Sequence, residues 1–152
     1  MKKTATAILA LLLCVTLLAS CGSPKTAISM KTFDTKAEQA GFTIVDAADQ
    51  FEEDAVESVH VAMGDGYQIE FYIVSTEQQA IMAYSQNKAN FEAAKGSSSS
   101  NSEVNLSNYS KYTQTSAGYY SVISRIDNTF IYVNANASYK SDINSFLKEI
   151  GY

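Results

Sequence analysis

The chain has little of the chemistry that catalytic and nucleic-acid-binding sites usually need. Its 152 residues include one histidine, two cysteines, one proline and no tryptophan, and its eleven Lys and Arg are outnumbered by sixteen Asp and Glu. Nucleic acid is excluded as a partner because its binding requires clustered basic side chains. The sequence has no Gly-x-Gly-x-x-Gly turn and no phosphate-binding loop ending in Lys-Ser or Lys-Thr, so nucleotide binding has no support either.

The N-terminal segment predicts export from the cytoplasm. Lys2 and Lys3 precede a short apolar run, residues 7–18, and Leu18-Ala19-Ser20-Cys21 closes it. A charged start, a short apolar core and a small-residue cleavage site are typical of a signal peptide, and the run is too short for a membrane span. The closing four residues resemble the lipobox of bacterial lipoproteins. This resemblance implies cleavage after residue 20 and a diacylated, palmitate-bearing Cys21.

The same resemblance implies a small bacterial cell-envelope lipoprotein, a class of generally uncharacterised function. It implies a lipid anchor on the extracytoplasmic side of the cell membrane, or in the outer membrane of a cell that has two. The sulfur of Cys21 is then part of a thioether, and Cys14 is removed with the signal peptide. No pair of thiols remains, so the domain folds without disulfides. One histidine and a lipidated cysteine exclude a zinc cage, and we predict no metal and no cofactor.

Cleavage also changes the charge of the chain. It removes Lys2 and Lys3 and no acidic residue, which leaves nine basic against sixteen acidic residues and a formal charge of −7. The domain is therefore not attracted to an anionic membrane, and the lipid has to provide the anchoring.

The remaining chain predicts one domain of common size. We expect a signal peptide over residues 1–20, a tether over 21–31 and a single α+β domain over 32–152, with a flexible Ser-rich loop at 96–103. A short helix is predicted over 35–40, with Thr35 as its cap. A longer one is predicted over 76–95, with Ser75 as its cap. A clear apolar stripe predicts a C-terminal helix; its members are Ile143, Phe146, Leu147 and Ile150.

Alternating apolar residues predict two β-hairpins. The first joins strands 56–63 and 67–74 through Gly64-Asp65-Gly66, and a three-residue loop pairs Val61 with Ile69. The second joins strands 119–126 and 129–136 through Asp127-Asn128 and pairs Val122 with Val133 and Ser124 with Ile131. Each hairpin is followed by a helix. We therefore predict an antiparallel sheet made of two hairpin-plus-helix units, with the helices on one face.

His60 is the only candidate for a catalytic acid–base group. The predicted register sets it opposite Glu70, and Ser58 points the same way two residues off. A surface cross-strand pair is the simpler interpretation. Hydrolytic chemistry through His60 with Ser58 or Glu70 is the alternative, although no nucleophile-elbow motif surrounds the serine.

Tyrosine is the unusual component, with ten in the chain. Tyr119, Phe130, Tyr132 and Arg125 share the predicted sheet face opposite the one that bears Val122 and Val133. Exposed tyrosines give rigid, amphipathic contact area, although tyrosine is also simply a good strand former. If uncovered, this face would be a partner-binding patch.

These observations favour a non-enzymatic binding or interaction module, anchored on the cell envelope through Cys21. Its partner would be an envelope protein, a peptide or a glycan. An envelope hydrolase and a purely structural assembly factor are the alternatives.

Overall fold

The computed structural model describes residues 24–52 and 55–152. The predicted signal peptide, Cys21 and the first residues of the predicted tether lie outside the described residues. Within the described part, no helix is both long and apolar enough to cross a membrane.

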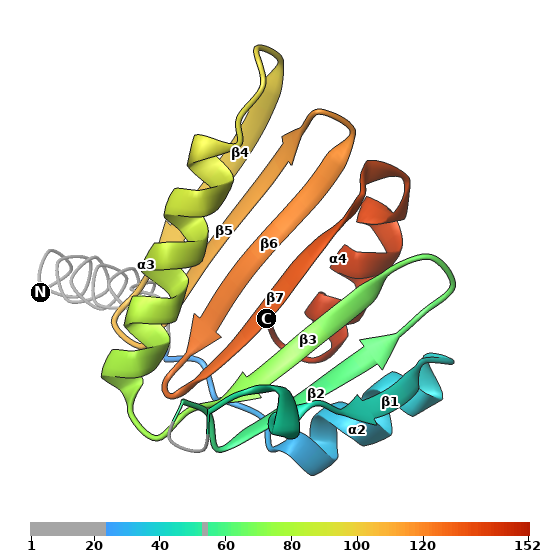
Figure 1. The fold of residues 1–152 in the computed structure, drawn as a ribbon, viewed down its shortest axis with the longest axis vertical. Coiled ribbons are helices and arrows are strands. Elements are labelled where there is room, and N and C mark those ends of the chain that lie inside the picture. Colours follow the sequence, from blue (N-terminus) through green and yellow to red (C-terminus); the bar gives the residue numbers. More distant parts are fainter. Residues whose placement is uncertain (1–23, 53–54) are drawn as a thin grey trace, which may run out of the picture.

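The described chain is an α+β domain built on one antiparallel sheet (Figure 1). The helices are α2 (Met30–Gln39), α3 (Glu77–Ala93) and α4 (Lys140–Glu149). The strands are β1 (Thr43–Asp46), β2 (Ser58–Met63), β3 (Gln68–Ile73), β4 (Ser99–Asn105), β5 (Tyr109–Ser116), β6 (Tyr119–Ile126) and β7 (Thr129–Asn136). Short 3₁₀ turns, η2 (Ala48–Gln50) and η3 (Ala137–Tyr139), follow β1 and β7. The seven strands lie in the order β1-β2-β3-β7-β6-β5-β4, which confirms the α+β class and the antiparallel sheet.

Helices cover both faces of the sheet, so the prediction of helices on one face is wrong (Figure 1). On one side, the α2/α4 face, Phe33 of α2 and Leu147 of α4 pack against Ile69 and Ile131. On the other side, the α3 face, the apolar side chains of α3 pack against β5, β6 and β7. Strand β6 shows the result: seven of its eight residues are buried, so both of its sides are covered. The two-unit repeat is not confirmed, because the helices after the two hairpins lie on opposite faces.

The register of the first hairpin also differs from the prediction. Val61 lies opposite Glu70, and Ile69 lies opposite Ala62. The prediction kept the apolar residues of each strand in one row because it assumed one buried face. In the structure the apolar residues of β2 and β3 are shared between the two faces. The second hairpin is confirmed: Val122 pairs with Val133, and Ser124 with Ile131.

Helix boundaries follow their capping residues. The cap of α2 is Ser29, six residues before the predicted cap Thr35, and its side chain accepts a hydrogen bond from the Thr32 amide. Thr76 and Gln79 form the capping box of α3, where Ser75 was predicted. The apolar stripe of the last helix is confirmed, with all four members buried.

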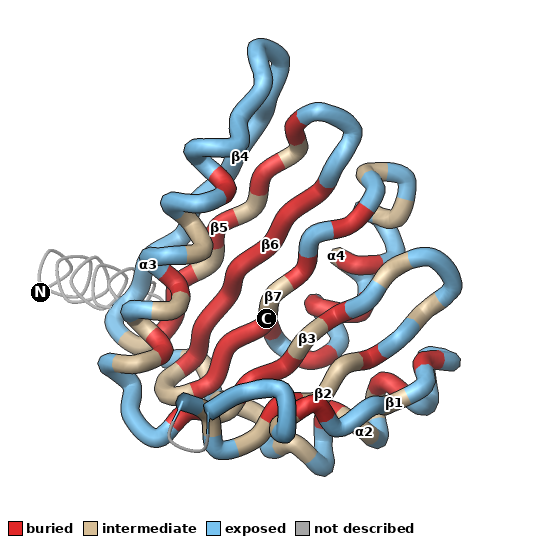
Figure 2. The backbone as a smooth tube through the Cα atoms, in the orientation of Figure 1, coloured by how far each residue is buried: buried red, intermediate tan, exposed pale blue. Residues whose placement is uncertain are grey.

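Most of the predicted Ser-rich loop is an edge strand. Residues 99–105 form β4, which pairs with β5 from Ser99↔Ser116 to Asn105↔Ser110. All seven residues are exposed, as Figure 2 shows. An edge strand needs only the backbone groups of its neighbour, so a polar sequence with nothing to bury can still extend a sheet.

The first described residues dock on the domain. The Lys25 amide donates to Asn108 Oδ1 (3.2 Å), Asn108 Nδ2 donates to the Lys25 carbonyl (2.7 Å), and Lys25 Nζ donates to the Gly151 carbonyl (2.6 Å). Ala27 and Ile28 pack against the core. The described part of the segment predicted as a tether is therefore held against the turn that joins β4 and β5.

Candidate functional site

Helix α3 covers half of the predicted tyrosine-rich patch. Phe130 and Arg125 are each 6% exposed beneath it, Tyr132 is half-buried, and Tyr119 is 55% exposed at the far end of β6. The condition for one uncovered patch is therefore not met at Phe130 and Arg125. The four residues instead border three separate hollows on the α3 face.

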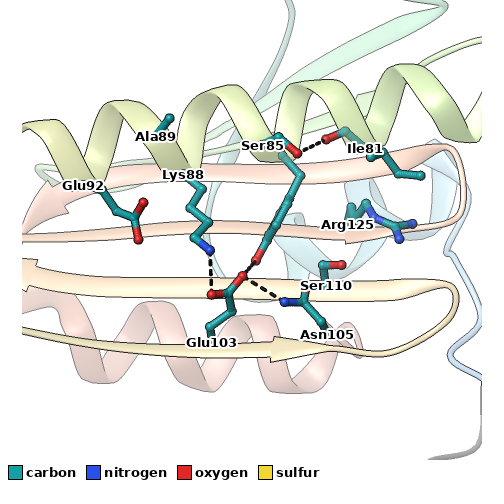
Figure 3. Close-up of a pocket in the computed structure, with 10 residues that line it drawn as sticks. Ile81, Ser85, Lys88, Ala89, Glu92, Glu103, Asn105, Ser110 and Arg125 are labelled. Atoms are coloured by element: carbon teal, nitrogen blue, oxygen red, sulfur yellow. Dashed lines mark hydrogen bonds and ion pairs between the residues drawn. The ribbon is translucent and has the colours of Figure 1, made fainter.

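The first hollow is a cleft of about 450 Å³ between α3 and the β4–β5 hairpin (Figure 3). Glu103 of β4 lies at its centre. Its carboxylate accepts hydrogen bonds from Lys88 Nζ (2.6 Å), the Tyr84 hydroxyl (3.0 Å) and Asn105 Nδ2 (2.9 Å). The bonds from Lys88 and Asn105 lower the pKa of Glu103, and burial together with the bond to Glu103 raises the pKa of Tyr84.

These hydrogen bonds join the edge strand β4 to helix α3. We call Glu103 and its partners Lys88, Tyr84 and Asn105 the Glu103 clamp. Lys88 balances the charge of Glu103, and both carboxylate oxygens of Glu103 accept hydrogen bonds. Arg125, at the floor of the same cleft, is balanced in turn by Glu77 in the first turn of α3 (3.1 Å). No sequence pattern pointed to Glu103, since it lies in a segment predicted as a loop.

The second hollow, the aromatic pocket, lies on the other side of α3 and has a volume of about 230 Å³. Its lining residues are Phe51, Glu70, Tyr72, Asn87, Phe130 and Tyr132. The pairings Glu70↔Tyr132 and Tyr72↔Phe130 place four of them side by side on β3 and β7. Asn87 contributes a wall from α3, and Phe51 contributes one from the turn after η2.

The rings of the aromatic pocket are fixed by one another. Tyr72 stacks on Phe130 with centroids 4.3 Å apart and an interplanar angle of 8°, and Phe51 meets Tyr72 edge-on at 5.7 Å. Tyr132 stacks on Phe91 of α3 at 5.5 Å. Two of the predicted residues, Phe130 and Tyr132, are therefore in this pocket. Phe51 and Tyr72 were missed because their positions depend on the register of β3 and on η2.

Glu70 is the one charged group among the described residues that line the aromatic pocket. Its carboxylate accepts from the Tyr72 hydroxyl (2.5 Å) and from Gln68 Nε2 (2.8 Å). Burial and the bond to Glu70 raise the pKa of Tyr72, so this hydroxyl stays a donor. None of the ion pairs formed by the described residues includes Glu70.

The third hollow, of about 520 Å³, lies where β6 begins and β2 ends. Met63, Gln68, Tyr119 and Asn134 are among its lining residues. Tyr119 thus stays available to a partner at this end of the sheet.

The structure does not bring His60 to Glu70. His60 lies opposite Phe71, so its side chain is on the α2/α4 face, whereas Glu70 is on the α3 face. His60 Nδ1 is 2.7 Å from Asp34 Oδ1 of α2, and Nε2 is 3.9 Å from Asp46 Oδ2. Among the described residues no hydrogen bond joins His60 to Ser58. The histidine links β2 to the helix that covers it.

The fold is thus a seven-stranded antiparallel sheet with helices on both faces and three hollows on one of them. No protein-family model matches the chain. No curated protein matches it either. Among solved structures it is similar to a GTP binding regulator from Thermotoga maritima, with 18% identity and a TM-score of 0.46, over 84% of this chain and 87% of that one. The function is therefore argued from this chain's own residues.

Proposed function

We propose that this protein is a lipid-anchored, non-enzymatic binding module of the bacterial cell envelope, and that it contacts its partner through the uncovered part of the α3 face. The lipid is carried by Cys21, in the lipobox Leu18-Ala19-Ser20-Cys21. The observation that carries the proposal is a row of cross-strand neighbours, half covered by α3 and half open.

The row can be followed strand by strand. Val45 lies opposite Val61, Val61 opposite Glu70, and Glu70 opposite Tyr132. Beyond Tyr132 the row continues beneath α3, where Ile123 and Tyr112 are fully buried. We call the uncovered part the open face and define it by Val45, Val61, Met63, Glu70, Tyr119 and Tyr132. In Figure 1 this region lies to the right of α3, over β1, β2, β3, the middle of β7 and the start of β6.

The composition of the open face supports binding to a protein. Val45 and Met63 are each 43% exposed, and Tyr119 is more exposed still. Apolar and tyrosine side chains that border hollows and are interrupted by few charges are typical of interface cores. A glycan or peptide partner is compatible with the same surface, and the experiment below separates these partners.

Two measurements on membrane-fraction material test the proposal. Intact-protein mass spectrometry should show loss of residues 1–20 plus acyl chains for the wild type and no acylation for Cys21→Ala. An unlipidated wild-type protein in the soluble fraction would overturn the anchor.

A photo-crosslinking residue at Tyr119 should then capture an envelope protein or peptide. The matched control is the same residue at Ser141, an exposed position of α4 on the opposite face. Equal capture at both positions would overturn binding through the open face. Binding would also be overturned if Tyr119 captured nothing and no glycan was eluted from the purified protein.

A further inference from the structure

We infer that the aromatic pocket takes one basic side chain, an arginine or lysine of the partner protein, with its cationic end on the Glu70 carboxylate. The inference rests on the proposed binding function and adds the chemistry of the contact.

Two carboxylates of the molecule, Glu70 and Glu103, have matching surroundings. Glu103 and Glu70 stand in the same cross-strand row, which runs through Tyr132, Ile123 and Tyr112. Each carboxylate accepts from a buried tyrosine hydroxyl and from a side-chain amide of its own strand. Glu103 accepts in addition from an ammonium group. Glu70 has the same two neutral donors and lacks the cation.

The position of Lys88 explains the difference. It reaches Glu103 from α3, at a Nζ–Oε2 distance of 2.6 Å. On the other side of α3, the residue that lines the aromatic pocket is Asn87, whose amide donates to the Ala83 carbonyl of its own helix. An ionised carboxylate has about four acceptor positions, and two neutral donors leave both its charge and about half of these positions unmatched.

The walls of the pocket favour a cation with an apolar stem. Aromatic side chains line the pocket beside the half-buried carboxylate, and partial burial strengthens a charge–charge contact relative to bulk water. The methylene groups of an arginine or lysine would pack on the rings while the charged end reaches Glu70. At about 230 Å³ the hollow is smaller than the roughly 300–1,000 Å³ of pockets that enclose a drug-sized molecule. Its size is that of a site for one side chain.

A sugar fits the pocket less well. Stacking on a sugar needs an exposed ring face, but Tyr72 and Phe130 are both buried and cover each other. The overall charge also favours a basic partner over a sugar, because the chain without residues 1–20 has a formal charge of −7. A basic partner is therefore also attracted from a distance.

The test is an NMR titration of the full-length chain in a non-ionic detergent micelle. The probe is N-acetyl-arginine methylamide, and its neutral isostere is the corresponding citrulline derivative. We expect the arginine probe to shift the resonances of Phe51 and Tyr132 with a Kd of the order of 1 mM, as suits a single side chain. Citrulline should bind roughly tenfold more weakly, since it cannot form the charge-assisted contact.

Variants locate the contact. Glu70→Gln should weaken arginine binding about tenfold, because it removes one charge-assisted pair. Glu38→Gln, an exposed carboxylate of α2 on the opposite face, should leave binding unchanged. Phe51→Ala removes an exposed wall without touching the core, so it tests the pocket if Glu70→Gln proves unstable, and it should also weaken binding.

Equal binding of arginine and citrulline, or an unchanged Kd in both Glu70→Gln and Phe51→Ala, would overturn the inference. The two proposals fail separately. If Tyr119 captures an envelope protein but the arginine probe does not bind, only the pocket assignment is wrong. If the probe binds at Glu70 but no envelope partner is captured, the proposed function is wrong.

Discussion

Gly66 shows how a single residue fixes the turn between β2 and β3. Its φ is +88°, and a Cβ at this position would lie 2.2 Å from the Tyr139 hydroxyl oxygen. Tyr139 is held there by stacking on Tyr67 with ring centroids 4.8 Å apart. Glycine is therefore required at this position for two reasons: the backbone conformation has a positive φ, and the ring of Tyr139 approaches closely.

We predict that Gly66→Ala lowers the free energy of unfolding by more than Gly118→Ala does. Both glycines have a positive φ, but nothing lies within 4 Å of a Cβ at Gly118. Gly118→Ala should cost only the backbone term, about 1–2 kcal/mol. Gly66→Ala adds an overlap, worth about 1–3 kcal/mol. Urea denaturation of the two variants measures the difference. Equal losses would mean that Tyr139 moves aside freely.

The position of strand β4 depends on contacts with α3 as well as with β5, because all seven residues of β4 are exposed and none packs into the core. Glu103→Ala should lower the free energy of unfolding by about 1–3 kcal/mol, since it leaves Tyr84 and Lys88 without their acceptor. Native-state hydrogen exchange should show faster exchange of the β4 amides than of the β6 amides. Glu92→Ala is the matched control: its carboxylate lines the same cleft, forms no hydrogen bond with any residue of the described ranges, and its loss should change stability by less than about 0.5 kcal/mol.

The same pair gives a pH test of the clamp. The hydrogen bonds from Lys88 and Asn105 lower the pKa of Glu103 in the folded protein. An acid whose pKa is lowered by folding stabilises the fold above its unfolded pKa, and this contribution is lost as the pH falls through the folded value. The difference in stability between wild type and Glu103→Ala should therefore shrink as the pH falls below about 4.5.

The sequence predicts elements best where a local pattern is sufficient. The stripe of α4 and the register of β6 with β7 are both correct, because one helix face and one short turn determine them. The β2–β3 register is wrong, since the apolar residues of these strands serve two faces and the pattern was assigned to one. Strand β4 was missed because its stability comes from the backbone of β5 and from Glu103, neither of which a hydropathy pattern contains.

The candidate site was predictable only in part, and α3 is the reason. Its apolar residues identify a helix but do not say which face of the sheet it covers, so the sequence left open whether Phe130 and Arg125 are exposed. Tyr119 and Tyr132 were correctly placed on a common face with them. The role of Glu70 depends on which side of β3 it occupies, and a shift of register by one residue reverses that side.

At the scale of the whole molecule, buried tyrosines should make the fold sensitive to alkali. Burial raises the pKa of Tyr72, Tyr84, Tyr109, Tyr120, Tyr132 and Tyr152 above the usual value near 10. The unfolded chain then loses these protons first. The tyrosine contribution to stability should be fully present below about pH 10 and be lost as the pH rises above it. Thermal melts from pH 8 to 12 measure this. A melting temperature that is flat to pH 12 would contradict the burial of these hydroxyls.

The position of Lys25 determines how the domain would stand on a membrane. Cys21 precedes it by four residues, which span at most about 14 Å even when fully extended. Lys25 is bonded to Asn108, in the turn after β4, so this end of the sheet faces the bilayer once Cys21 is acylated. Tyr119 lies at the other end of β6. Eight strand residues at about 3.3 Å each separate the two ends by roughly 25 Å.

Nitroxide labels on the lipidated protein in vesicles would measure this orientation. A label at Leu106→Cys, beside Asn108, should be relaxed by a nickel-chelating lipid headgroup. A label at Asp65→Cys, in the β2–β3 turn at the opposite end, should not be affected. Each label is the one free thiol of the lipidated protein, because Cys21 is acylated and Cys14 leaves with the signal peptide. Equal relaxation of the two labels would mean that the domain lies flat. The open face would then be turned partly toward the lipid and not held out toward a partner.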